Sequence, residues 1–194
     1  LGKALQVFRE PDRVICGLED TKDFNKVIEL LKLKPSKIKI MKLESAEVTK
    51  HAINAWLANS IVFANEIAKI CELTGADAKE VEEGMKSEKR IGYKAYLSPG
   101  TAFSGGTLAR DLKYLSNFKK NNYWISIIES NNTHKNWIID KIKGLELNYK
   151  PNVALIGLTY KMGTNTLRRS ISIEISKWLH KNSFKIKAFD YEVK

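Results

Sequence analysis

The chain has 194 residues, 43% hydrophobic and 28% charged, with a formal net charge of +11. This is the composition of an ordinary globular protein, and its length suits one large domain or two small ones. No apolar run is long enough to span a bilayer and no signal peptide opens the chain, which excludes a membrane-spanning protein at the level of sequence. We therefore expect a soluble, cytoplasmic protein without a membrane partner.

The positive charge is spread along the chain, with lysine clusters at 32–42 and 141–150. A basic protein can bind nucleic acid, a membrane surface or phosphorylated small molecules, or it can simply present a solvated basic surface. No basic helix or interleaved aromatic stripe favours nucleic acid. Cys16 and Cys71 lie among apolar residues and indicate small core residues in a reducing compartment.

The first elements in chain order are a strand, a helix and a strand. "DRVICG" at 12–17 and "SKIKIMKL" at 36–43 have the character of short strands, and apolar residues at helical spacing predict a helix over 22–33. A long helix follows over about 45–73, with Ser45 as N-cap and Gly75 as its stop.

The long helix is apolar around most of its circumference, so it should be buried on most sides. One small domain offers too little surface to bury it. This pattern predicts a dimer built through the helix.

The next segment continues with helices. Asp77, followed by Glu80, resembles a capping box. Residues 89–106 are expected to form a loop, and two further helices are expected over 107–120 and 123–143.

The last quarter changes character. Residues 152–158 form an apolar run typical of a strand buried in a parallel sheet, and an amphipathic helix over 170–182 and a strand over 184–189 follow. The predicted fold is an α-rich central domain followed by the start of an α/β, Rossmann-like domain with a parallel sheet. Both ends of the sequence look cut, so we expect a fragment.

Polar residues on the long helix are candidates for chemistry. Lys50 and Asn54 are four residues apart and share a face, and Asn65 follows on the same stripe. A buried ammonium can stabilise a developing oxyanion. The alternative is that Lys50 extends its charge to solvent and Asn54 satisfies nearby backbone.

The stretch "SGGTLARD" offers a second candidate. Gly105 and Gly106 let backbone amides approach an anion, Thr107 can cap the helix that begins there, and its dipole attracts phosphate. Asp111, one turn later, can act as a base or favour the dipole. An ordinary loop turn explains the two glycines equally well.

Three further basic residues are candidates for binding phosphate: Arg90 before the long loop, and Lys161 and Arg168 after the strand at 152–158. The alternatives for Arg90 are that it anchors the loop or pairs with an acid, and the alternative for Lys161 and Arg168 is a solvated loop. The histidines and cysteines lack metal-ligand spacing, and no G-x-G-x-x-G motif occurs.

Several segments together resemble the UDP-glucose/GDP-mannose dehydrogenase family. The matching text is "PDRVICG", "ESAEVTKHAINAWLANSIVFANEIAKICELTGADAKEV", "KRIG", "PGTAFSGGTLARDLKYL" and "NVALIGLTYKMGTNTLRRS". The resemblance implies an enzyme that oxidises the C6 alcohol of a UDP- or GDP-sugar to a carboxylate with NAD, and that forms a homodimer.

The resemblance also implies a division of the chain. Residues 1–17 would be the tail of an NAD-binding domain, 18–121 the helical dimerisation domain, 122–150 a connecting helix and 151–194 the start of the nucleotide-sugar domain. The NAD fingerprint and the catalytic glutamate would then precede residue 1.

Residue roles follow by the same resemblance. Lys50 would stabilise the oxyanion, Asn54 would bind the substrate, and Asp111 would assist a water or a general base. Arg90 would reach the substrate of the neighbouring subunit, and Arg168 would lie near the NAD pyrophosphate. The other implied substrate-binding residues are Phe103, Gly105, Tyr160 and Lys161.

The stretch "SGGTLARD" departs from the family pattern, which reads Gly-Gly-x-Cys with an aspartate four residues after the cysteine. That thiol forms the thioester needed for the second oxidation, and it is missing here. The protein would then stop at the aldehyde, use a water-based route or act on another sugar. Alternatives are a non-catalytic relative that binds a nucleotide sugar, and a nucleic-acid module suggested by charge alone; we expect no nucleic-acid partner.

Overall fold

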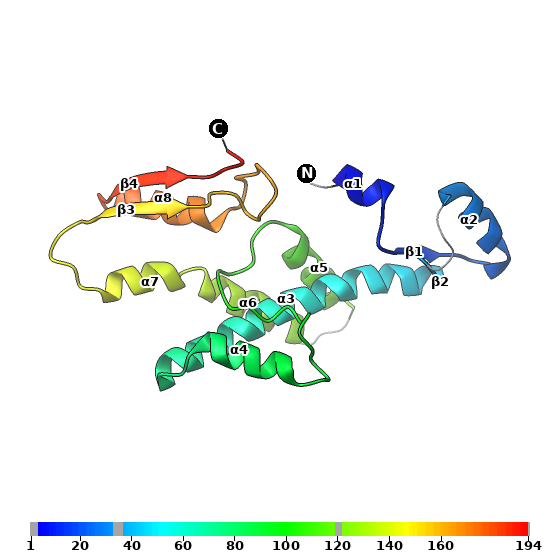
Figure 1. Cartoon of the computed structure of the whole chain (residues 1–194), viewed down its shortest axis with the longest axis horizontal. Coiled ribbons are helices and arrows are strands. Elements are labelled where there is room, and N and C mark those ends of the chain that lie inside the picture. Colours follow the sequence, from blue (N-terminus) through cyan, green and yellow to red (C-terminus); the bar gives the residue numbers. More distant parts are fainter. Residues whose placement is uncertain (1–3, 33–36, 119–121, 194) are drawn as a thin grey trace. The chain divides into compact units, whose positions relative to one another are not determined.

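A computed structural model describes residues 4–32, 37–118 and 122–193 (Figure 1). The chain divides into two compact units, Leu1–Ile53 and Asn54–Lys194, which are described separately below. The predicted fold class, an α-rich middle followed by the beginning of a parallel α/β domain, is confirmed. No helix among the described residues is both long enough and apolar enough to cross a membrane.

The first unit contains the predicted strand–helix–strand sequence. Its elements are α1 (Ala4–Arg9), β1 (Val14–Gly17), η1 (Thr21–Asp23), α2 (Phe24–Leu31) and β2 (Ile38–Met41). β1 and β2 are parallel, with Val14 opposite Ile38. Residues 33 and 36 of the predicted segments lie outside the described residues. A Cβ at Gly17 would lie 2.9 Å from the Cα of Leu43, the first residue of the long helix. Only glycine therefore fits at the end of β1.

The long helix, α3 (Leu43–Thr74), begins two residues before the predicted cap, so Ser45 lies inside it. Its predicted stop is confirmed. Gly75 takes a φ of +77°, and the N–H of Ala76 donates to the carbonyl of Cys71 at 3.1 Å, the backbone pattern of a glycine-terminated helix.

In the single chain α3 is not covered on most sides, so its burial through a second subunit stays a prediction. The residues that it buries are mainly small, among them Ala55, Ala58 and Ala64. Large apolar side chains remain exposed at seven-residue intervals, at Trp56, Phe63 and Ile70. These three residues form the apolar stripe of α3.

The helical part of the second unit packs α5 (Thr107–Ser116) and α6 (Tyr123–His134) beside α3, with α4 (Ala78–Ser87) and α7 (Trp137–Gly144) further along. The helix predicted over 123–143 is two helices, because the chain turns at Lys135 and Asn136. The core of this part consists of Ala55, Ala58, Val62, Phe103, Leu112 and Ile127.

A ladder of polar contacts joins α3 to α6 and α7. Successive contacts are about two helical turns apart. Residue numbers increase in the same direction along α3 and along α6 and α7, so α3 runs parallel to these helices. Each rung is a side-chain hydrogen bond: Tyr123 to Asn59 at 3.1 Å, Ser130 to Glu66 at 2.5 Å and Trp137 to Glu72 at 3.1 Å.

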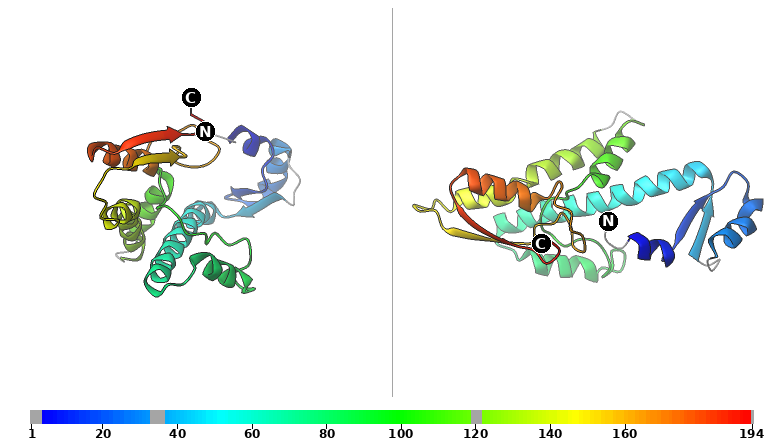
Figure 2. Two further views of the ribbon diagram at one scale, coloured as in Figure 1. Left: turned by 60° about the vertical axis from the view of Figure 1, so that its left-hand side comes forward. Right: turned by 90° about the horizontal axis from the view of Figure 1, so that it is seen from above.

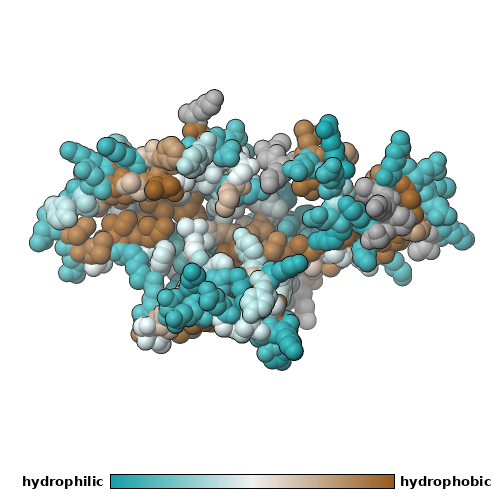
Figure 3. Space-filling model, in the orientation of Figure 1, coloured by the Kyte–Doolittle hydropathy of each residue, from teal (hydrophilic) through white to brown (hydrophobic). Residues whose placement is uncertain are grey.

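The last part is a βαβ module formed by β3 (Asn152–Ile156), α8 (Ile171–Lys181) and β4 (Lys185–Phe189), with the two strands parallel. Figure 2 shows α8 against one face of the strand pair. The prediction that the 152–158 strand is buried is wrong here. Its residues alternate in exposure and Ile156 is 84% exposed, because only one face is covered. Figure 3 shows the apolar surface over this module in brown.

Candidate functional site

Asn54 and Asp111 meet between α3 and α5. The Asn54 Nδ2 donates to Oδ2 of Asp111 at 2.5 Å, and the Nε of Arg110 lies 3.5 Å from Oδ1. Asp111 is fully buried, although it is a carboxylate. Burying a charged group costs free energy unless other groups bind it, so a position like this favours a chemical role.

Lys50 lies one helical turn before Asn54 on α3, in the first unit, and its side chain is exposed. Arg90 is also exposed. Its Nε and its backbone N–H both reach Oε1 of Glu88, at 3.0 Å and 3.1 Å, so its described contacts are local. Phe103, in contrast, is buried in the same core as Leu112, the neighbour of Asp111.

The segment 104–107, here called the diglycine bend, enters α5. Gly106 is the N-cap residue, so the prediction that Thr107 caps the helix is wrong. Gly105 has a φ of +81°, and a Cβ there would lie 3.3 Å from the ring of Tyr160. A Cβ at Gly106 would lie 2.0 Å from Nη1 of Arg169. The two glycines therefore permit close approach by an aromatic ring and a guanidinium.

A cavity of about 470 Å³ opens beyond the carboxyl ends of β3 and β4, where ligands bind in parallel α/β sheets. Tyr160 and Lys161 line it, and the Lys161 ammonium lies 5.4 Å from the centre of the Tyr160 ring. The hydroxyl of Ser104 donates to the Tyr160 carbonyl at 3.3 Å, which joins the diglycine bend to the cavity wall.

Asp190, the residue directly after β4, also lines this cavity. Its Oδ2 accepts from the backbone N–H groups of Leu158 at 2.6 Å and Thr159 at 3.0 Å, and its Oδ1 accepts from Glu192. These bonds, the one from Leu158 foremost, hold the pKa of the Asp190 carboxyl below its usual value because they favour the charged form. The carboxylate thus ties together the two segments that follow the parallel strands.

We expect Asp190→Asn to melt at a lower temperature than the parent at pH 7, and this difference to shrink as the pH falls below about 4. A lowered folded-state pKa gives stability above the unfolded-state pKa, and that stability disappears as the pH falls through the folded-state pKa. Melting curves from pH 7 to pH 3 measure it, with exposed Asp140→Asn on α7 as control. A difference that stays constant with pH would contradict this role.

The predicted NAD contact, Arg168, is exposed in the loop between β3 and α8. This loop does not fit a dinucleotide fingerprint, because Gly157 is followed by no second glycine at the required spacing and α8 begins only at Ile171. Within the described ranges, no group of three or more histidine, cysteine or acidic residues could hold a metal ion.

Sequence reasoning named Asn65 but not its role, and it missed the other groups that hold the long loop. Asn65, Asn131 and His134 are buried and bind the loop backbone, and Arg169 contacts Gly106. A buried asparagine bonded to backbone has the same sequence signature as a surface one. For Arg169 the sequence gave one signal, the pair of arginines at 168–169. The pair did not indicate which of the two arginines contacts the diglycine bend.

Comparison with known proteins identifies relatives along most of the chain. Residues 44–135 match the central domain of the UDP-glucose/GDP-mannose dehydrogenase family. The UDP-glucose 6-dehydrogenase of Rickettsia bellii is 37% identical over 97% of this chain and 46% of its own length. The UDP-glucose 6-dehydrogenase YwqF of Bacillus subtilis is 34% identical over 97% of this chain and 44% of its own length.

Solved structures agree. A UDP-glucose dehydrogenase from Pyrobaculum islandicum superimposes with a TM-score of 0.81 at 25% identity, over 96% of this chain and 44% of that protein. The chain spans about half the length of the curated relatives that it matches. Through its residues 44–135, and through relatives that align with 97% of its length, the chain belongs to the UDP-glucose/GDP-mannose dehydrogenase family.

Proposed function

We propose that the protein acts in an NAD-dependent dehydrogenase that oxidises the C6 alcohol of a UDP- or GDP-sugar. The observation that carries the proposal is the 37% identity to a UDP-glucose 6-dehydrogenase over 97% of the chain. The Asn54–Asp111 hydrogen bond, with its buried carboxylate, and the cavity at the strand ends support it, because they provide a protected carboxylate and a place for a ligand.

Within this proposal, Asp111 assists a base or a water. Asn54 orients the Asp111 carboxylate and binds the substrate, and Lys50 stabilises negative charge on the reacting oxygen. Tyr160, Lys161, Phe103 and Gly105 bind the nucleotide sugar, with Arg90 reaching the site of a partner subunit. Arg168 contacts the pyrophosphate of NAD. NAD supplies the hydride acceptor when it is bound.

The domain division and the dimer are also proposals. Residues 1–17, 18–121, 122–150 and 151–194 would be the end of an NAD domain, the dimerisation domain, a helical connection and the start of the nucleotide-sugar domain. The apolar stripe of α3 supports a homodimer, since Trp56, Phe63 and Ile70 leave a helix face without apolar cover in the single chain.

A second candidate is a divergent or non-catalytic member that binds a nucleotide sugar without the two-step oxidation. It is favoured by the absence of a cysteine from the stretch "SGGTLARD". Cys71 is buried on α3, seventeen residues after Asn54. At a rise of about 1.5 Å per residue this is about 25 Å along the helix, so its thiol does not replace the missing one.

The test is NADH formation, followed by absorbance, when the full-length protein, including the proposed NAD-binding domain, is given UDP-glucose, other UDP-sugars or GDP-mannose. Analysis of the product separates the routes, since a carboxylate reports two oxidations and an aldehyde reports one. Calorimetric binding of the sugar nucleotide with no NADH formed would select the second candidate. Absence of both binding and turnover would reject both.

A further inference from the structure

Three buried polar side chains hold the backbone of the long loop at two points. The Asn65 Oδ1 accepts from the N–H of Gly100 at 2.8 Å, and His134 Nε2 lies 2.8 Å from the carbonyl of the same residue. Asn131 Oδ1 accepts from the N–H of Phe103 at 2.8 Å, and its Nδ2 donates to the Phe103 carbonyl at 3.0 Å. We call these three side chains the loop clamp.

The clamp satisfies groups that have no partner in a helix or sheet. Residues 98–103 form no regular structure, so their backbone groups have no helix or strand partners, and those of buried Phe103 need side-chain partners. Because a carbonyl only accepts, His134 must carry its proton on Nε2 to bond Gly100. Asn131 fits Phe103 only in one orientation, with its oxygen toward the N–H and its nitrogen toward the carbonyl.

The clamped residues lie where two hydrophobic cores meet. Ala102 is buried with Ile171 and Ile175 of α8, whereas the next residue, Phe103, is buried with Leu112 and other residues of the helical core. Successive side chains of the loop therefore enter different cores. The diglycine bend follows directly and contacts Tyr160 and Arg169 of the βαβ module.

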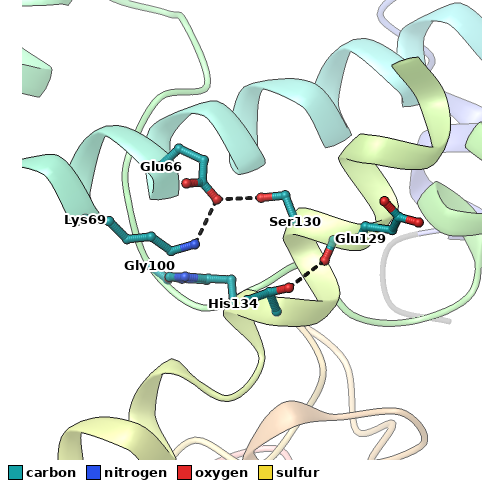
Figure 4. Close-up of polar contacts among 7 residues, drawn as sticks. Glu66, Lys69, Gly100, Glu129, Ser130 and His134 are labelled. Carbon is teal, nitrogen blue, oxygen red and sulfur yellow. Dashed lines mark hydrogen bonds and ion pairs between the residues drawn. The ribbon is translucent and has the colours of Figure 1, made fainter. Parts of the chain in front are cut away.

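The clamp rests on a braced helix pair. Figure 4 shows Glu66 of α3 bound to both Lys69 and Ser130, beside His134 and Gly100. The Glu66 Oε1 accepts from Lys69 at 2.8 Å and from Ser130 at 2.5 Å, and these bonds lower its pKa. Ser130 precedes Asn131, so the Ser130–Glu66 bond fixes the part of α6 that carries Asn131 and His134 of the loop clamp.

We propose that Asn131 is a positioning residue: through the backbone of Phe103 it sets where the diglycine bend lies against Tyr160 and where α5 carries Asp111. Its effect on turnover rests on the proposed function, but its effect on the loop does not. A misplacement of about 1 Å far from the reacting atoms can lower a rate by about 10²-fold. Loss of the clamp should therefore lower kcat even at temperatures where the variant remains folded.

The deciding variant is Asn131→Asp, which keeps an acceptor for the Phe103 N–H but turns the donor toward its carbonyl into a second acceptor. Asn132→Asp is the matched control, since Asn132 is the exposed next residue on the same helix and gains the same charge. Hydrogen exchange of the segment 98–106, melting temperature, kcat and KM are measured for both variants in the full-length protein, including the proposed NAD-binding domain.

We expect loop exchange to rise at least about tenfold in Asn131→Asp and to stay unchanged in Asn132→Asp. The kcat should fall by up to about 10²-fold in the first and less than about twofold in the second. Equal loop exchange in the two variants would overturn the proposal. If the parent shows no dehydrogenase activity, the proposed function fails, and loop exchange still decides the positioning role.

A measurement on the parent keeps the proposal falsifiable if Asn131→Asp does not fold. The amide protons of Gly100 and Phe103 should exchange at least about tenfold more slowly than that of exposed Thr101 between them. Similar exchange at all three positions would show that the clamp is open in solution and would reject the proposal.

Discussion

Replacing Asp111 by asparagine is expected to lower kcat by about 10²–10⁴-fold, the usual contribution of a general acid or base. Asparagine has nearly the same shape and can still bond Asn54, but it cannot take up a proton from a water or a sugar hydroxyl. The measurement is steady-state NADH formation with UDP-glucose as substrate. It tests the chemistry of the carboxylate separately from its packing.

The melting temperature of Asp111→Asn distinguishes this role from a structural one. Because Asp111 is fully buried, removing its charge removes a desolvation cost, and this offsets the loss of its contact with the Arg110 Nε at 3.5 Å, so the variant should fold and melt near the parent temperature. Asp140→Asn, on the exposed surface of α7, removes the same charge and should retain parent turnover. If Asp111→Asn keeps parent turnover, or loses it only by unfolding, the proposed base is wrong.

Lys50→Ala is expected to lower kcat by about 10²–10³-fold, comparable to the loss of one donor to a developing oxyanion. The ammonium would act only as negative charge builds on the reacting oxygen, so KM for the sugar nucleotide should change much less than kcat. Steady-state kinetics at saturating NAD measure both parameters.

The matched control for Lys50 is Lys79→Ala, which removes an exposed lysine from α4. It should keep kcat within about twofold, as expected of a surface charge. Arginine at position 50 retains the charge in a different shape and should recover only part of the rate. Parent kcat in Lys50→Ala would show that the ammonium does not stabilise the reacting oxygen.

Local sequence determined most of the secondary structure. Helical spacing located α2, α3 and α5, and Gly75 marked the end of α3 because a left-handed backbone favours glycine. The break at Lys135 and Asn136 was missed, since neither residue is glycine or proline. The family, too, could be identified from ordered motifs.

The sequence by itself showed which residue types flank the diglycine bend, and that no cysteine is among them. Only the tertiary structure decided which of them meet. Asn54 and Asp111 are 57 positions apart and Phe103 and Asn131 are 28 apart, and each pair forms because packed apolar faces bring distant helices or loops together. Burial was likewise decided by packing, because an apolar pattern shows which face avoids water but not what covers it, as the apolar stripe of α3 and Ile156 show.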